Sequence, residues 1–233
     1  MDEMRRTLDA GLTQLGLDLP PDRRDTLCQF GKIVVEQNRV MNLTAITEPA
    51  QVARLHLLDS LTALLCGDFA GKKLIDVGCG AGFPGVPMAI GCPEMELTLL
   101  DSLGKRMRWL ESALPQLGVE AECVTARAEE EAFCRREQYD CAVSRAVARL
   151  NILLELTAPF VKVGGMVLAM KGDRAVEELA EAGNGVKKLG LAFEAGKTFS
   201  LGDAAHTVLI FRKVSPTPPG YPRRYAKIKQ NPL

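Results

Sequence analysis

The feature that most constrains the fold of this 233-residue chain is the glycine-rich segment from Asp76 to Gly85, DVGCGAGFPG. It follows the apolar pair Leu74-Ile75 and precedes an apolar run from Val86 to Ile90. This is the pattern of a strand, a tight turn and a helix, since glycines let the backbone pass close to a ligand and a new helix points free N–H groups at it. Four glycines in eight positions disfavour a turn that merely packs a helix on a sheet. The sequence therefore predicts a nucleotide-binding turn.

Two cofactors fit this turn. Gly80 to Gly85 reads as G-x-G-x-x-G, the dinucleotide fingerprint, and Asp101 ends the next apolar run at the spacing of an acid that binds a ribose hydroxyl. The methyltransferase form, Asp-x-Gly-x-Gly-x-Gly, matches as many residues and also explains Asp76, whose carboxylate suits the charged amino-acid tail of S-adenosylmethionine. Both alternatives place Asp101 on a ribose, so this residue does not distinguish them.

The length of the chain favours S-adenosylmethionine. Residues 72–213 are enough for one doubly wound domain, and no segment of ordinary size remains for a separate substrate domain. The only histidines are His56 and His206, so an obvious hydride-transfer acid is missing. A nicotinamide-dependent oxidoreductase stays open as the alternative.

The chain divides into a helical first part and an alternating second part. Residues 1 to about 66 are predicted to be helical, since Met4, Leu8 and Leu12 share one helical face. Strands are expected near residues 73–77, 96–101, 119–124, 139–143, 163–170, 191–199 and 206–213. Helices are expected near residues 84–91, 103–114, 128–136, 149–161 and 174–188.

This alternation predicts an α/β fold with a Rossmann-like, seven-stranded, mainly parallel sheet covered by helices on both faces. The last two strands have no clear helix between them, so we expect a final hairpin whose last strand runs antiparallel. We expect one compact domain made of an N-terminal helical extension (1–66), the core (67–214) and a basic C-terminal tail (215–233).

Composition excludes several classes of protein. Hydrophobic residues at 47% and charged residues at 25% are ordinary for a globular chain. No apolar run approaches the ~20 residues needed to span a bilayer, and the N-terminal residues lack the apolar region of a signal peptide. Seven cysteines without a C-x-x-C motif, beside only two histidines, argue against a metal site and for free thiols in the reducing cytoplasm.

Positive charge is concentrated at the C-terminal end. Residues 204–233 contain six Lys and Arg and not one Asp or Glu, whereas the rest of the chain has 23 basic against 29 acidic residues. Such a block is suited to phosphates, and it favours nucleic-acid binding over the alternative, a solvated tail that only aids solubility. Tyr221 and Tyr225 lie among these charges and could stack on bases. The predicted RNA-binding residues are Arg223, Arg224, Lys227 and Lys229.

The loops after the strands are where ligands bind in such folds. Glu129 follows the third expected strand, where it could face an adenine or simply be an acid favoured by the helix dipole. Ser144-Arg145-Ala146 follows the fourth strand, beside the place of a methyl acceptor. The chain has neither the Asn/Asp-Pro-Pro-Tyr loop typical of amine methylation nor the Pro-Cys pair of pyrimidine carbon methylation. The remaining class of methyl acceptor is one that needs no general base, such as a purine ring nitrogen. Arg145 could then bond guanine O6 or a phosphate, its alternative being a surface ion pair.

Two groups of polar residues in the N-terminal part are further candidates for a role in the site or in the fold. His56, Asp59 and Ser60 share one face of a helix. They could line the cofactor or acceptor cleft, or a His56–Asp59 pair could hold the helices onto the sheet. Asn38 and Asn42 lie one turn apart and could cap a helix end.

Together these residues resemble the RsmG family, also called GidB, whose members methylate guanine N7 in small-subunit ribosomal RNA. The resemblance covers essentially the whole chain, and Cys79 departs from it where serine is expected. The segments that carry it are Asn38-x-x-x-Asn42-Leu43-Thr44, Arg54-x-His56-x-x-Asp59-Ser60, the turn Asp76–Gly85, Asp101-Ser102-x-x-Lys105-Arg106, Ala128-Glu129, Ser144-Arg145-Ala146-Val147-Ala148 and Tyr221-Pro222-Arg223-Arg224.

The resemblance implies a class I S-adenosylmethionine-dependent methyltransferase acting on one guanine of 16S rRNA, position 527 in the RNA's own numbering. The expected cofactor contacts are Asp76, Gly78, Gly80, Phe83, Asp101, Ala128, Glu129 and Arg145. The expected catalytic residues are Arg145, which orients the acceptor, with His56 and Asp59. We expect a monomer whose partner is 16S rRNA or the small ribosomal subunit, without a membrane or metal. A non-catalytic RNA binder in ribosome assembly is a further alternative, and the sequence leaves open whether free rRNA or the assembled subunit is the substrate.

Overall fold

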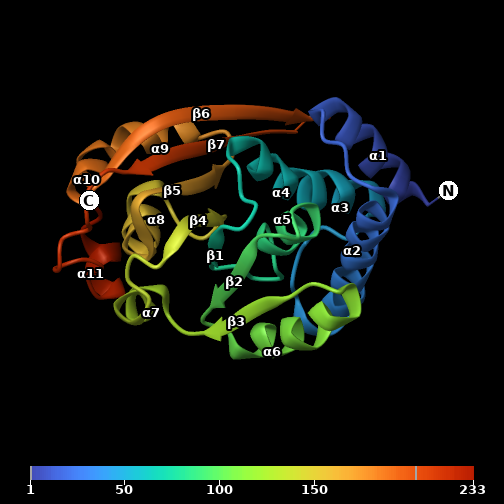
Figure 1. Ribbon diagram of the computed structural model, residues 1–233, viewed down its shortest axis with the longest axis horizontal. Helices are drawn as coiled ribbons and strands as arrows, with labels where there is room; N and C mark the ends of the chain where they lie inside the picture. The colour runs from blue at the N-terminus through green and yellow to red at the C-terminus, as the bar shows by residue number, and fades with distance from the viewer. Residues whose placement is uncertain (1, 203) are drawn as a thin grey trace.

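The structure is a computed structural model that describes residues 2–202 and 204–233. Its centre is one seven-stranded sheet with the order β3-β2-β1-β4-β5-β7-β6 (Figure 1). The strands are β1 Lys73–Val77, β2 Glu96–Asp101, β3 Ala121–Thr125, β4 Tyr139–Arg145, β5 Val161–Lys171, β6 Leu191–Leu201 and β7 Ala204–Lys213. Strands β3, β2, β1, β4 and β5 pair in parallel, whereas β7 is antiparallel to both β5 and β6. The predicted sheet, including its antiparallel last strand, is confirmed.

Helices surround this sheet. The helical segments of the first part are α1 Glu3–Leu15, α2 Pro21–Met41, α3 Pro49–Val52, the π-helix Ala53–Leu58, α4 Asp59–Leu61 and the 3₁₀ helix Thr62–Cys66. Those that follow are α5 Gly85–Gly91, α6 Gly104–Ala113, the 3₁₀ helix Leu114–Leu117, α7 Ala128–Cys134, α8 Leu150–Thr157, the 3₁₀ helix Ala158–Phe160, α9 Ala175–Glu181, α10 Gly183–Lys188 and α11 Tyr225–Gln230. Two predictions need correction: the helix expected over 174–188 is two helices that meet at Ala182, and α11 was not expected at all. No described helix has the length and apolar character to cross a membrane.

The sheet separates two apolar cores, because alternate side chains of a strand point to opposite faces. On β1, Leu74 belongs to the core shared with α1, α2, α5 and α6, whereas Ile75 and Val77 belong to the core beneath α8 and α10. The N-terminal helices are therefore part of one core and extend it past the end of the sheet.

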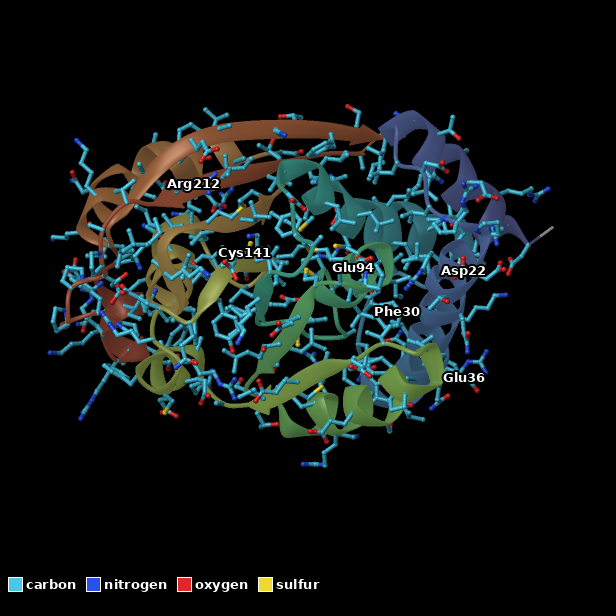
Figure 2. The ribbon with its side chains drawn as sticks, in the orientation of Figure 1. Asp22, Phe30, Glu36, Glu94, Cys141 and Arg212 are labelled. Carbon is cyan, nitrogen blue, oxygen red and sulfur yellow. The ribbon has the colours of Figure 1, made fainter. Side chains whose placement is uncertain are left out.

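Helix α2 shows how the N-terminal part reaches the site. Phe30 is fully buried on its inner side, whereas Asp22 and Glu36 are exposed (Figure 2). The ring centroid of Phe30 lies 5.0 Å from that of Phe83, in the glycine-rich turn. At the end of α2, Asn38 Oδ1 accepts bonds from two backbone N–H groups, those of residues 43 and 44. The predicted helix cap is confirmed for both residues, since Asn42 is the left-handed C-cap of α2 and Asn38 binds the backbone that follows it.

The C-terminal tail is packed on the core. Lys213 is buried and its Nζ donates to the carbonyl oxygens of Ala158 and Val161 at 2.8 and 3.0 Å. Arg136 donates to the Tyr221 carbonyl at 2.8 Å, and Ile228 of α11 is fully buried. Figure 1 shows α11 beside α8 and α7, at the opposite end of the molecule from α1. Helix α11 therefore belongs to the folded structure, at the edge of the sheet that carries the loops after β3 and β4.

Candidate functional site

The glycine-rich turn is fixed by backbone hydrogen bonds to β2. The N–H groups of Gly78 and Cys79 both donate to the Leu100 carbonyl, at 2.8 and 3.1 Å. Gly78 has φ +76°, and a Cβ there would lie 2.4 Å from Cγ2 of Val147. Only glycine fits this position, because the left-handed conformation and the close approach both exclude a side chain. The turn thus begins directly against the loop after β4.

Asp76 lies beneath this turn. It is fully buried, and its Oδ2 accepts a 2.7 Å hydrogen bond from the Gly85 N–H at the start of α5. Burial raises the pKa of Asp76 to about 7. Its Oδ1 has no hydrogen-bond partner among the described residues. The structure therefore makes Asp76 a support of the turn, with one oxygen left for a further donor.

The first cavity, about 420 Å³, opens at the carboxyl ends of β1, β2 and β3. Five of the expected cofactor contacts line it, namely Gly78, Gly80, Asp101, Ala128 and Glu129. Asp76, Phe83 and Arg145 are not among its lining residues. The loops after three strands thus converge on one hollow, as expected for a doubly wound sheet.

Asp101 is held in the first cavity by the backbone. Its Oδ2 accepts from the Gly80 N–H at 3.0 Å and its Oδ1 from the Leu103 N–H at 2.8 Å. Each oxygen keeps capacity for a second donor, because a carboxylate offers about four lone-pair sites. Three exposed apolar side chains, Leu103, Val147 and Tyr225, also line the cavity. A carboxylate that can accept from hydroxyl groups, beside apolar walls, is the arrangement expected of a site for a nucleoside.

The second cavity, about 600 Å³, adjoins the first, since Ala146 and Val147 line both. Arg145 lines it, and its Nη1 donates to Asp59 Oδ2 at 2.7 Å and to the Leu55 carbonyl at 3.0 Å. The guanidinium carbon also lies 5.2 Å from the ring centre of Phe83. The structure therefore joins Arg145 and Asp59, whereas the side chain of Arg145 is separate from the first cavity.

His56 lies in the π-helical segment that lines the second cavity, and such segments are frequent at functional sites. Its Nε2 is 2.8 Å from Oγ1 of Thr44, and its ring stacks on Phe83 with centroids 4.7 Å apart. Burial, helped by the charge of Arg145, lowers the pKa of His56 to about 4. His56 is therefore neutral near pH 7.

The histidine that pairs with Asp59 is His206, contrary to the expected His56–Asp59 pair. Nδ1 of His206 lies 3.1 Å from Oδ1 of Asp59, and its Nε2 lies 2.9 Å from Oγ1 of Thr62. Burial, together with the charge of Arg145, lowers the pKa of His206, and Asp59 opposes this. Ser60 is fully buried and donates to the His56 carbonyl at 2.6 Å, so it does not line the cavity. His206 comes from β7, and no local pattern could have found it.

Exposed arginines surround both cavities. Arg127, Arg149, Arg174 and Arg224 are the residues that immediately precede α7, α8, α9 and α11. In the described part of the chain, Arg149 alone among these four forms an ion pair, with Glu181 at 3.3 Å. A cation at a helix N-terminus is disfavoured by the helix dipole. These arginines therefore do not serve the helices, and they suit an external anion.

The tail cations fall into two groups. Arg223 is bound to the fully buried Glu155, with its Nη2 2.6 Å from Oε2 and its backbone N–H 2.8 Å from Oε1. Arg212 pairs with Glu194 at 2.8 Å, and Lys213 is buried, so half of the basic block is used inside the protein. The cations that stay exposed without an ion pair in the described chain are Arg224, Lys227 and Lys229. Counting charges in the sequence therefore overestimated the number of tail cations that are free to bind RNA.

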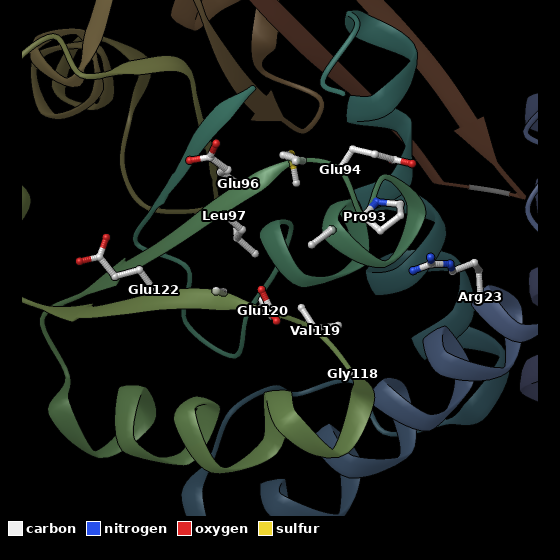
Figure 3. A pocket seen from close by; sticks show the side chains of 12 residues that line it. Arg23, Pro93, Glu94, Glu96, Leu97, Gly118, Val119, Glu120 and Glu122 are labelled. Carbon is white, nitrogen blue, oxygen red and sulfur yellow. The ribbon is translucent and has the colours of Figure 1, made fainter. Parts of the chain in front are cut away.

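Another hollow, of about 540 Å³, lies at the opposite edge of the sheet, between β2, β3 and the N-terminal helices (Figure 3). It is lined by Glu94, Glu96, Glu120 and Glu122, with Arg23 as its one cation among the described residues. An anionic ligand is disfavoured there by charge. Within residues 2–202 and 204–233, no group of three or more His, Cys, Asp or Glu is arranged to hold a metal ion.

Known proteins are similar to this chain in sequence or in fold. The family model described as "GidB: rRNA small subunit methyltransferase G" matches residues 23–203. A protein named ribosomal RNA small subunit methyltransferase G from Alkaliphilus oremlandii is 41% identical over 99% of both chains, and one of the same name from Brevibacillus brevis is 39% identical over 95% of this chain and 96% of its own. The solved structure of M. jannaschii TYW2 in complex with AdoMet is similar with a TM-score of 0.53 and 12% identity, over 68% of this chain and 76% of that one. At that identity the likeness concerns the fold alone.

Proposed function

Since the chain belongs to the family of rRNA small subunit methyltransferase G, we propose that it transfers a methyl group from S-adenosylmethionine to N7 of one guanine in 16S rRNA, position 527 in the RNA's own numbering. The observation that carries this proposal is the pair of adjoining cavities, which share Ala146 and Val147. One cavity suits a nucleoside, and the other presents a positioned guanidinium. The family match does not favour the nicotinamide-dependent oxidoreductase that the glycine pattern alone allows.

The first cavity fits the cofactor through Asp101 and the glycine turn. Asp101 would accept the ribose hydroxyls with the lone pairs that the backbone leaves free. Ala128 and Glu129, at the start of α7, would border the base. Gly78 and Gly80 bring the backbone close, and the buried Oδ1 of Asp76, which has no partner in the described chain, would accept a further donor beneath the turn. When bound, S-adenosylmethionine supplies a methyl group on a positively charged sulfur.

The second cavity would position the acceptor. Guanine N7 carries a free lone pair, so no general base is needed and catalysis rests on orientation. Arg145 is fixed by Asp59 and the Leu55 carbonyl, and its Nε has no hydrogen-bond partner in the described chain, so it can donate to O6 or a phosphate. His56 and Asp59 are positioning residues in this proposal. Neutral His56 adds no charge beside a guanine that becomes cationic on methylation.

The N-terminal extension, residues 1–66, supplies Leu55, His56 and Asp59 to this acceptor cavity. We therefore assign acceptor recognition to the extension together with the loop after β4. The core, 67–214, supplies the cofactor cavity, and the tail, 215–233, adds Tyr225 and exposed cations to its rim.

The four exposed arginines around both cavities, with Lys227 and Lys229, form the proposed RNA surface. Each phosphate that they neutralise releases counterions, so binding should weaken steeply with salt. The proposed partner is the small ribosomal subunit or its 16S rRNA, met in the cytoplasm by a monomer.

The test uses purified protein, S-adenosylmethionine and small ribosomal subunits that lack the modification. Borohydride–aniline treatment, which cleaves RNA at N7-methylguanine, maps the product by primer extension. A single new cut in the decoding-region loop of 16S rRNA is expected. Cofactor binding without any cut in subunits or free 16S rRNA would mean a binding protein for ribosome assembly. Thermal stabilisation by a nicotinamide dinucleotide and not by S-adenosylmethionine would support the oxidoreductase instead.

A further inference from the structure

Tyr225, the first residue of α11, brings the C-terminal tail into the wall of the first cavity. Its side chain is only partly buried, with 37% of the residue exposed. The guanidinium carbon of Arg127 lies 6.0 Å from the ring centre, and Arg127 lines the same cavity. The hydroxyl has no hydrogen-bond partner among the described residues. The ring is therefore neither a core side chain nor a polar anchor, and the cavity is where its apolar surface is available.

The position of this ring is set by the core. Arg223, two residues before it, is bound through its backbone and side chain to buried Glu155 of α8. Ile228, three residues after it, is fully buried. Leu156, next to Glu155 in the chain, lines the same cavity as Tyr225. Helix α11 is thus held at both ends of its first turn, with Tyr225 between the two anchors.

The other side of α11 is cationic. Arg224 and Lys227 are three residues apart, so they lie on one side of the helix, and Lys227 is two residues from Tyr225, which places it away from the ring. Both are exposed, as is Lys229, and none forms an ion pair in the described chain. One short helix therefore presents an aromatic ring to the nucleoside cavity and cations to the proposed RNA surface.

We propose that Tyr225 packs on the adenine of bound S-adenosylmethionine and that α11 couples cofactor binding to RNA binding. The inference rests on the proposed function and extends it to regulation of the same site. An aromatic ring stacks well on a purine, and a phosphate backbone held by the exposed cations of α11 fixes this helix over that purine. Because such coupling is reciprocal, each ligand raises the affinity for the other by the same factor.

The experiment measures the Kd of S-adenosylhomocysteine, which has no methyl group to transfer, by equilibrium dialysis with and without saturating unmodified small subunits. For the wild-type chain we expect subunits to tighten binding about fivefold or more. Tyr225→Ala should weaken subunit-free binding about three- to tenfold and remove most of the tightening, whereas Tyr225→Phe should keep both. Phe133→Ala is the matched control, since Phe133 is an exposed aromatic of α7 that lines neither cavity.

The double variant Lys227→Ala/Lys229→Ala isolates the RNA side of α11. It should leave the subunit-free Kd unchanged and reduce the tightening, whereas Lys187→Ala/Lys188→Ala on α10 should change neither. A wild-type Kd in Tyr225→Ala, or undiminished tightening in that variant, overturns the inference. If the wild-type chain itself binds no S-adenosylhomocysteine, the proposed function fails; if it methylates subunits while Tyr225→Ala matches it in both Kd values, only this inference fails. Thermal unfolding of each variant separates loss of contact from loss of folding.

Discussion

The two adjoining cavities are built in different ways. The first is formed largely by backbone and by the carboxylate of Asp101, which backbone N–H groups hold, in loops that each follow their own strand. The second is formed by charged side chains that hold one another, with Asp59 between Arg145 and His206. A site made of backbone depends on local sequence, whereas a site made of paired side chains depends on how distant elements pack. Cofactor and acceptor recognition should therefore be separable by mutation.

Arg145→Ala should separate them most strongly. The rate of methyl transfer at saturating cofactor should fall about 100-fold or more, because a displaced acceptor loses the benefit of orientation. Cofactor affinity should change less than about threefold, because Arg145 does not line the first cavity. Single-turnover transfer of labelled methyl to subunits and equilibrium dialysis give the two quantities. Arg145→Lys, which keeps the charge and loses the planar fork, should lie between the two. Equal losses of rate and affinity would make Arg145 a cofactor residue and end the comparison.

Asp101→Asn should have the opposite signature. Loss of a charged acceptor for the ribose should weaken S-adenosylmethionine binding about 10- to 100-fold, the effect of about 1.5–3 kcal/mol. Methyl transfer at saturating cofactor should stay close to that of the wild type. Calorimetric titration checks the affinity. Asparagine has one acceptor oxygen, so it keeps only one of the two bonds from the Gly80 and Leu103 N–H groups, and thermal unfolding measures the loss of stability that follows. An unchanged affinity would remove the ribose assignment.

His56, which lines the second cavity, should make the free energy of unfolding depend on pH. Its pKa is about 4 in the folded chain and near 6.5 when unfolded, so the unfolded state takes up the proton first as pH falls. The free energy of unfolding should therefore drop by about 1–3 kcal/mol between pH 6.5 and pH 4. Urea unfolding of the wild type and His56→Gln across this window isolates the effect, since the opposite contribution of Asp76 is common to both. Parallel curves would contradict the lowered pKa.

The smallest effect is expected at the rim of the second cavity. Arg149→Ala/Arg174→Ala should weaken subunit binding several-fold. The slope of log affinity against log salt concentration should become shallower by about 0.7–0.9 for each lost phosphate contact. The cofactor Kd should not change. Lys187→Ala/Lys188→Ala removes the same charge at the far end of α10 and serves as the control. If the control pair lowers the salt slope as much, the binding surface is diffuse and not centred on the cavities.

The sequence predicted best what depends on neighbours along the chain. The strands, the turn and Asp101 follow from apolar runs and glycine spacing, and the structure places the predicted strands close to their expected bounds. The sequence could not show that β7 brings His206 to Asp59, because that contact depends on the order and direction of strands. It could not show that Arg223 is bound to Glu155, because charge counts do not tell which partners lie nearby. Helix α11 was missed because the preceding prolines made the tail look irregular.

The arginines at the starts of α7, α8, α9 and α11 have a consequence for the protein on its own. Arg224 opposes the positive end of α11, which has no acid in its first turn, so the isolated chain carries a repulsion there that dissolved salt screens and a bound phosphate turns into attraction. Ribosomal RNA would then act as a stabilising ligand as well as a substrate, and the chain should melt at a higher temperature on the ribosome than in dilute buffer. A surface prepared for its partner in this way leaves the protein less stable whenever that partner is absent.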